Sequence, residues 1–255
     1  MSEAFDTRRD FPDLRSTVPG IDWPAVPSPA AATMLALLEQ LEHSQWCTPE
    51  ELKRRQMVQL GSLVRHAASH VPYYRGGPDD DPHPDPSGGR GAIDPNQWAQ
   101  IPVLTRAEVQ DNFDALQSND IPTGHGEVSK VSTSGSTGSP VTVKTTMLAQ
   151  TFAAVCGLRC HRWHRRDLGG RLAGIYIDRE RQATYPEGLQ QPGWGWPAGE
   201  IYRTGPAALL SLNTPIADQA EWLQRQRPNY LLSTPSNLLV LAEHCIEHNT
   251  RLPGL

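Results

Sequence analysis

Residues Val131–Lys144 read VSTSGSTGSPVTVK, and this stretch is the most informative in the sequence. Two short runs rich in Val and Thr, at 128–133 and 141–146, flank a loop made only of Ser, Gly, Thr and Pro. Such runs favour β-strands, and such loops favour tight turns. The stretch therefore predicts a strand, a polar loop and a return strand.

The composition of this loop suits phosphate binding. Gly135 and Gly138 can adopt positive φ angles, so that backbone N–H groups turn toward one point. The hydroxyl donors of the loop are Ser134, Ser136 and Thr137. Phosphate oxygens bind in such concave sets of donors, and Lys144 would add a positive charge. An ordinary hairpin turn is the alternative.

The loop does not match three well-known motifs. No Gly-Lys-Ser/Thr follows at the spacing of a Walker A loop, and the G-x-G-x-x-G fingerprint of dinucleotide-binding folds is missing. The G-x-S-x-G pattern of a nucleophile elbow is missing from it as well. A phosphate role would thus depend on a different loop type.

Composition indicates a soluble protein. The 255 residues are 38% hydrophobic with a mean hydropathy of -0.49, and no apolar run approaches the roughly 18 residues of a membrane helix. A net charge of -5 gives no general attraction to nucleic acid or to an anionic membrane. The first ten residues lack a secretory apolar region, and the four cysteines are too scattered for a disulfide framework. A cytoplasmic location is expected.

The first part of the chain is predicted to be helical. Residues 1–27 mix charge, Pro and Gly without periodicity, which predicts an extended N-terminal arm. A helical region at 28–75 follows, in which Thr48–Glu51 forms a capping box. Residues 76–95 are rich in Asp, Pro and Gly and are expected to be a flexible linker.

Residues 96–255 are predicted to form an α/β domain. The expected elements are a short helix capped by Thr105, the hairpin, a helix at 147–165, a strand at 172–177, a helix from Thr214-Pro215, a strand at 230–232 and a helix at 235–248. Strands that alternate with helices favour a sheet with parallel pairing.

Two groups of side chains suggest metal ligands, but neither is assigned to a metal. Asp79–Asp81, His83 and Asp85 lie in the linker, where nothing fixes ligand geometry. Cys156, Cys160 and His164 recur every four residues along the helix at 147–165, together with Leu and Phe, so a core face is favoured over a zinc site.

Aromatic residues in the second half are candidates for a substrate pocket. Tyr176 lies near the end of the predicted strand at 172–177, and Trp194 and Trp196 lie in a Gly/Pro/Trp loop. These side chains would suit an aromatic or acyl group. Filling the core beneath a long loop is the equal alternative for the tryptophans.

Four stretches resemble one protein family. Thr-Ser-Gly-Ser-Thr-Gly-x-Pro at 133–140 resembles the phosphate-binding signature of the adenylate-forming enzymes, a superfamily that includes acyl-CoA synthetases. Stretches 60–75, 101–106 and 222–241 are similar to its phenylacetate-CoA ligase-like branch. The resemblance implies the N-terminal part of the large adenylate-forming, AMP-binding domain: a helical N-terminal region, then a mixed sheet with flanking helices.

The resemblance also implies an enzyme that activates a carboxylic acid, with an aryl or arylacetic acid favoured. The carboxylate attacks the α-phosphate of ATP, pyrophosphate leaves, and coenzyme A then takes the acyl group. ATP, Mg²⁺ and coenzyme A are thereby implied. The implied phosphate-binding residues are Ser134, Gly135, Ser136, Thr137, Gly138 and Lys144. Many relatives instead place a lysine directly after the motif's proline, where this chain has Val141.

Parts of the family's active site have no counterpart in the sequence. The acidic residue for Mg²⁺, the aspartate for the ribose, the adenine pocket and the mobile C-terminal lysine all lie beyond the matched region. The expectation is an N-terminal half that is complete only with a C-terminal half and lid domain. Expected partners are a small carboxylate and either a chain that supplies that half or a second copy of this chain. Two alternatives are a non-catalytic nucleotide-binding or partner-binding homologue, and nucleotidyl transfer without coenzyme A, as in deazaflavin-adenylylating relatives.

Overall fold

The computed structural model describes residues 13–75, 93–133 and 140–255. The chain divides into two compact units. We call residues 39–154 the hairpin unit, and residues up to 38 together with 155–255 the sheet unit. The loop residues 134–138 lie outside the described ranges, and the domain divisions expected from the sequence stay predictions.

Two helices lie in the first part of the chain, as the sequence predicts. They are α1 (Pro29–Ser44) and α2 (Pro49–His70). Helix α2 begins at its predicted cap, because Thr48 Oγ1 accepts a hydrogen bond from the backbone N–H of Glu51 at 3.2 Å. Helix α2 ends before the 3-10 turn η1 (Pro72–Tyr74). The carbonyl of its last residue, His70, accepts a hydrogen bond from the backbone N–H of Asn119 at 2.8 Å.

Glu51, in the first turn of α2, is expected to titrate far below an ordinary glutamate. Arg54 Nε and Arg55 Nε donate to its carboxylate at 2.8 and 2.7 Å, and these hydrogen bonds lower the pKa of Glu51 from 4.5 to about 2. Because the folded pKa is the lower one, the ionised carboxylate stabilises the helix above pH 4.5, and this contribution is lost as the pH falls toward 2. In an NMR titration the Glu51 carboxyl midpoint should rise toward 4.5 in an Arg54→Ala/Arg55→Ala variant. An unchanged midpoint in that variant would contradict the assignment.

Short elements connect α2 to the hairpin. Helix α3 (Pro95–Gln100) was not predicted, whereas α4 (Arg106–Asp111) has the predicted capping box. In that box Thr105 N–H donates to Glu108 Oε2 at 2.7 Å, which together with the reciprocal bond lowers the pKa of the Glu108 carboxyl. The 3-10 turn η2 (Thr123–His125) then leads into the hairpin.

Helix α5 (Met147–Trp163) begins where predicted, but its buried side is not the predicted one. Cys156 and Cys160 are exposed, and Phe152 is 44% exposed, so the core-face interpretation of that stripe is wrong. The buried residues are instead Ala154, Val155 and Leu158. Among the described residues, no group of three or more His, Cys, Asp or Glu side chains is arranged to hold a metal ion.

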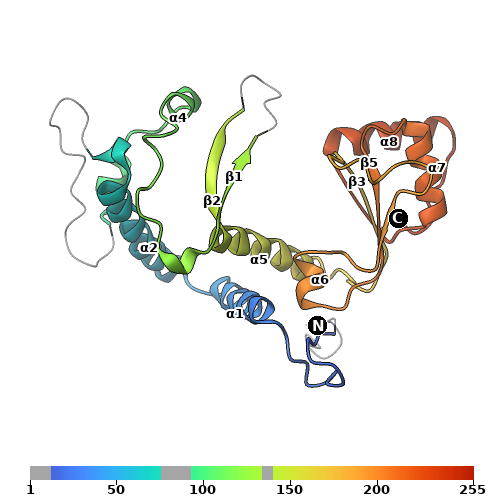
Figure 1. Ribbon diagram of the computed structural model, residues 1–255, viewed down its shortest axis with the longest axis horizontal. Helices are drawn as coiled ribbons and strands as arrows, with labels where there is room; N and C mark the ends of the chain where they lie inside the picture. The colour runs from blue at the N-terminus through green and yellow to red at the C-terminus, as the bar shows by residue number, and fades with distance from the viewer. Residues whose placement is uncertain (1–12, 76–92, 134–139) are drawn as a thin grey trace. The chain divides into compact units, whose positions relative to one another are not determined.

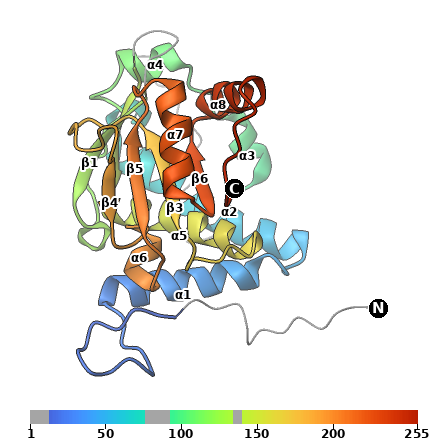
Figure 2. The ribbon, with the colours of Figure 1, turned by 90° about the vertical axis from the view of Figure 1, so that its right-hand side faces the viewer.

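The sheet unit contains a mixed four-stranded sheet with flanking helices, which confirms the expected fold class. Its strands lie in the order β4 (Leu189–Gln191), β5 (Ala207–Ser211), β3 (Leu172–Tyr176) and β6 (Tyr230–Ser233). Strand β3 pairs in parallel with β5 and β6, whereas β4 pairs antiparallel with β5. The accompanying helices are α6 (Ala198–Ile201), α7 (Ile216–Gln226) and α8 (Pro235–Glu247). Figure 2 shows α7 in front of the strands.

The core of the sheet unit lies between these strands and α7. Trp222 and Leu223 of α7 are completely buried, and so is Ile175 of β3. The indole N–H of Trp222 donates to the carbonyl of Glu187 at 3.2 Å, so the polar atom of this buried side chain is paired. The remaining members of the cluster are Ala173, Ala208, Leu210, Ala220 and Leu241.

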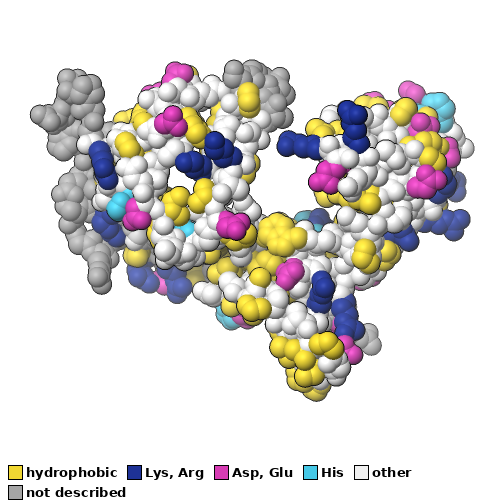
Figure 3. Space-filling model, viewed as in Figure 1, with side chains coloured by type: hydrophobic (Ala, Val, Ile, Leu, Met, Phe, Trp, Pro, Cys, Tyr) yellow, Lys and Arg dark blue, Asp and Glu magenta, His cyan; other side chains and the backbone are white. Residues whose placement is uncertain are grey.

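One edge strand of the sheet carries an exposed apolar side chain. Strand β6 is the last strand, and its Leu232 is 57% exposed. Leu239 and Ile246 of the following helix α8 are 60% and 80% exposed, and Figure 3 shows hydrophobic side chains at the surface. Over the described ranges of the chain, no helix has both the length and the apolar character needed to cross a membrane.

Candidate functional site

The hairpin holds the two ends of the predicted phosphate loop together. Strands β1 (Val128–Ser132) and β2 (Thr142–Thr146) pair antiparallel, with Val128 opposite Thr146 and Ser132 opposite Thr142 (Figure 1). This arrangement confirms the two strands expected to flank the loop.

Polar contacts close the base of the loop. The backbone N–H of Thr133 donates to the carbonyl of Val141 at 2.9 Å, and the N–H of Val141 donates back to Thr133 Oγ1 at 3.0 Å. One position further from the loop, the hydroxyls of Ser132 and Thr142 lie 2.7 Å apart. Both ends of the loop are thus fixed by hydrogen bonds, and the phosphate role of Ser134, Gly135, Ser136, Thr137 and Gly138 stays a prediction.

Two lysines face each other across the hairpin. The sequence contains three lysines, and two of them, Lys130 and Lys144, are direct cross-strand partners. Directly opposite residues share one face of an antiparallel pair, and like charges there are destabilising. Lys130 Nζ lies 5.7 Å from the centroid of the Phe113 ring, and in the described part of the chain neither lysine forms an ion pair. An anion bound between them would relieve the repulsion.

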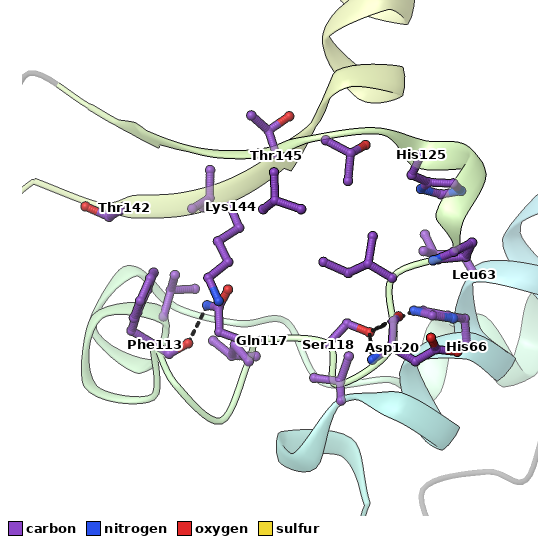
Figure 4. A pocket seen from close by; sticks show the side chains of 18 of the residues that line it. Leu63, His66, Phe113, Gln117, Ser118, Asp120, His125, Thr142, Lys144 and Thr145 are labelled. Carbon is purple, nitrogen blue, oxygen red and sulfur yellow. Dashed lines mark hydrogen bonds between the residues drawn. The ribbon is translucent and has the colours of Figure 1, made fainter.

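Lys144 lines a pocket inside the hairpin unit. The pocket has a volume of about 750 Å³ and lies among β2, helix α2, helix α4 and the segment 113–125. Figure 4 shows the Lys144 side chain pointing into it, toward Phe113 and Gln117. Its apolar lining residues are Leu63, Val71, Leu104, Val109, Phe113, Leu116, Ile121, Pro122, Val128 and Val143.

Polar side chains gather at another part of the pocket wall. His66 Nε2 lies 3.0 Å from Ser118 Oγ, and the Ser118 hydroxyl donates to the carbonyl of Asp120 at 2.7 Å. The Asp120 carboxylate lies 3.9 Å from His70 Nε2. Figure 4 shows His66, Ser118 and Asp120 together and apart from Lys144.

A second hollow of about 470 Å³ adjoins the first at the hairpin. Val109, Phe113 and Thr142 line both, and Lys130 lines the second one. In Figure 3 the lobe that carries the hairpin is visibly hollowed, with Lys or Arg side chains near the opening. The two lysines therefore lie at neighbouring openings on one face of the hairpin.

The aromatic candidates for a substrate pocket all lie in the sheet unit. Trp194 is partly buried, and its indole N–H donates to the carbonyl of Gly170 at 2.9 Å. Its ring meets those of Tyr230 and His161 edge-on, with centroids 5.3 and 5.7 Å apart. Trp196 is 60% exposed and Tyr176 is 39% exposed. Their role in binding a substrate stays a prediction.

Burial and charge shift two pKa values among these groups. Partial burial lowers the pKa of His161, and the nearby charges of Arg166 and His164 lower it further. Partial burial raises the pKa of the Tyr176 hydroxyl, with a smaller contribution from Asp178. His161 therefore favours its neutral form and Tyr176 favours its protonated form.

Sequence reasoning identified Lys144 but missed its partner and the pocket. The Lys130–Lys144 pairing had a signal, since in a symmetric hairpin centred near Thr137 these positions are equally far from the loop. The rest of the pocket had no signal in the sequence, because its walls come from helix α2, segment 113–125 and β2, which are far apart along the chain.

Comparisons with known proteins identify a fold class. No protein-family model matches the chain, and no curated protein is similar enough to count as a match. The fold is that of part of an acyl-CoA ligase chain. The structure in question is an open conformation of 2-hydroxyisobutyryl-CoA ligase in complex with 2-HIB-AMP and CoA, with 18% identity and a TM-score of 0.50.

The match covers 79% of this chain and 45% of the ligase chain. The same ligase in its thioesterification state has a TM-score of 0.49, again at 18% identity, over 79% of this chain and 41% of that one. The matched part of this chain therefore spans less than half the length of the ligase. At this identity the likeness establishes the fold alone.

Proposed function

We propose that this chain contributes the nucleotide phosphate-binding hairpin of an ATP-dependent acid–CoA ligase. The observation that carries the proposal is the closed base of a Thr-Ser-Gly-Ser-Thr-Gly-x-Pro loop. The fold shared with part of an acyl-CoA ligase supports the same conclusion.

The proposed reaction has two steps. A carboxylate oxygen attacks the α-phosphorus of ATP, the bond to the β-phosphate oxygen breaks, and pyrophosphate leaves. The thiolate of coenzyme A then attacks the acyl carbon, the acyl–phosphate bond breaks, and AMP leaves with its phosphate. An aryl or arylacetic acid is the proposed substrate class.

The role of the loop in this reaction is electrostatic. Its backbone N–H groups and the hydroxyls of Ser134, Ser136 and Thr137 would hold the β- and γ-phosphates while negative charge builds up on the leaving pyrophosphate. Lys144 lies within β2 and would add a positive charge at longer range. The hairpin thus provides binding and orientation.

The remaining groups of the reaction are not assigned to residues of this chain. The ligase that shares the fold is more than twice as long as the matched region, so we propose that the full activity needs further polypeptide. That polypeptide would be a C-terminal portion, another chain or a second copy. Magnesium would arrive with the nucleotide, and the described residues offer no metal-binding cluster to which it can be assigned.

Calorimetric titration with MgATP tests the loop. We expect binding in the micromolar range that a Ser136→Ala/Thr137→Ala double variant loses by at least about tenfold, which corresponds to about 1.4 kcal/mol. The matched control is Ser69→Ala/Thr184→Ala, which removes two exposed hydroxyls elsewhere and should bind as the unaltered protein does.

Two results would count against the proposal. Equal MgATP affinity in the unaltered chain and the loop variant would show that the nucleotide binds elsewhere. No binding by a folded chain would show that this hairpin does not hold phosphates by itself.

A further inference from the structure

We propose that the pocket of the hairpin unit binds an organic monocarboxylate with an apolar body, and that Lys144, assisted by Lys130, holds the carboxylate. The pocket shares Lys144 with the proposed phosphate site, but it is identified from its own described lining residues. The inference therefore does not rest on the proposed function.

The size and lining of the pocket favour a small organic molecule. A volume of about 750 Å³ lies within the range of sites that bind metabolites and drug-sized ligands. Leu63 of helix α2, Val109 of α4, and Phe113, Leu116 and Ile121 of the connecting segment supply apolar walls. Such walls favour a ligand whose body is hydrocarbon or aromatic.

The charges in the pocket favour an anion at the hairpin side. The Lys144 side chain points into the pocket beside Phe113 (Figure 4). Lys130 is the cross-strand partner of Lys144, so both side chains lie on the same face of the hairpin. The acidic residue that lines this pocket, Asp120, lies near His70 and next to Ser118 and His66, apart from Lys144. Asp111 lines the adjoining hollow together with Lys130. A carboxylate beside Lys144 would therefore reduce the lysine–lysine repulsion without meeting the Asp120 side chain.

The surroundings of Lys144 favour a carboxylate over a polyphosphate. Gln117 lies beside Lys144, but its side-chain N–H donates to the carbonyl of Phe113. The hydroxyl of Thr142 is hydrogen-bonded to Ser132, and that of Thr146 accepts from the backbone N–H of Ala149. A triphosphate needs many donors, whereas a single carboxylate needs only a cation and an apolar space behind it.

The test uses 4-phenylbutyrate as the probe and 4-phenylbutanamide as its neutral counterpart, both titrated into the full chain by calorimetry. We expect the acid to bind at least about tenfold more tightly than the amide. Lys144→Met should lower the affinity for the acid by about tenfold and leave that for the amide unchanged. Lys53→Met, at an exposed position of α2, is the matched control and should bind the acid normally.

NMR locates the probe. With methyl-labelled protein, 4-phenylbutyrate should shift the signals of Leu63, Val109 and Val143, which line the pocket, and leave that of Leu239 in the sheet unit unchanged. The loop variant Ser136→Ala/Thr137→Ala should bind the acid as the unaltered chain does, and saturating MgATP should not displace it. This result separates the pocket from the nucleotide site.

Several outcomes would overturn the inference. They are no binding of 4-phenylbutyrate by the folded chain, equal affinity for acid and amide, unchanged binding by Lys144→Met, or displacement by MgATP. Methyl shifts confined to the sheet unit would place the acid elsewhere and would likewise refute it.

Discussion

Replacing Gly138 with tryptophan is expected to abolish MgATP binding while the protein stays folded. The proposed phosphate site depends on backbone N–H groups that point at the ligand, and a large side chain inside the loop would occupy the space of the phosphates. The affinity should fall from the micromolar range to beyond the millimolar range, a loss of more than about 4 kcal/mol. Gly135→Trp should have the same effect, and calorimetry measures both.

The matched control for these variants is Gly157→Trp. Gly157 is an exposed residue of helix α5, and a Cβ atom added there would meet no other atom within 4 Å. The substitution should leave both MgATP binding and the thermal unfolding midpoint nearly unchanged. Unchanged MgATP affinity in both loop variants would refute the assignment of the loop.

Trp222→Ala is expected to be the most destabilising single substitution in the sheet unit. Trp222 is completely buried among Ile175, Leu210 and Leu241, so its removal leaves a large cavity. Deleting such a side chain costs about 3–5 kcal/mol, a large part of a total stability of about 5–15 kcal/mol. The carbonyl of Glu187 also loses its hydrogen bond to the indole. Urea denaturation measures the loss.

Two further variants separate packing from hydrogen bonding. Trp222→Phe keeps an aromatic ring but has no donor for the carbonyl of Glu187. It should lower the free energy of unfolding by about 1–3 kcal/mol, which is less than the loss for Trp222→Ala. Trp46→Ala removes a tryptophan that is 83% exposed and should change stability by less than about 0.5 kcal/mol. A cost for Trp222→Ala no greater than that for Trp46→Ala would contradict the described core.

The starts of α2, α4 and α8 could be predicted because their signals are local. Thr48, Thr105 and Thr234 each accept a hydrogen bond from a backbone N–H three residues later, so the interaction is encoded in a short stretch. The hairpin was predictable for the same reason, since its strands are joined by one short loop.

Strand β5 could not be predicted, although it is central to the sheet. It reads Ala-Ala-Leu-Leu-Ser, and alanine and leucine favour helices over strands. Pairing with β3 and β4 fixes it as a strand, and these partners are distant in the sequence. The predicted strand at 172–177 was also slightly too long, because it ends at Tyr176 and Ile177 is 65% exposed.

The candidate site was predicted only in part, for a related reason. The ordered loop residues and Lys144 stand in one continuous stretch, so the sequence alone suggested a phosphate role. The pocket is assembled from α2, α4, the segment after α4 and β2, and no local pattern joins these elements. The buried side of α5 was predicted wrongly because a four-residue stripe drifts around a helix, and packing selected Ala154, Val155 and Leu158 instead.

The position of β6 as an edge strand of the described sheet has a practical consequence for handling the protein. Natural sheets protect such edges with lysine, proline or a bulge, and the sequence Tyr-Leu-Leu-Ser of β6 has neither lysine nor proline. Leu232 of this strand and Leu239 and Ile246 of α8 are exposed. Concentrated samples should therefore precipitate by edge-to-edge aggregation, and sulfate or phosphate salts should lower the solubility limit further.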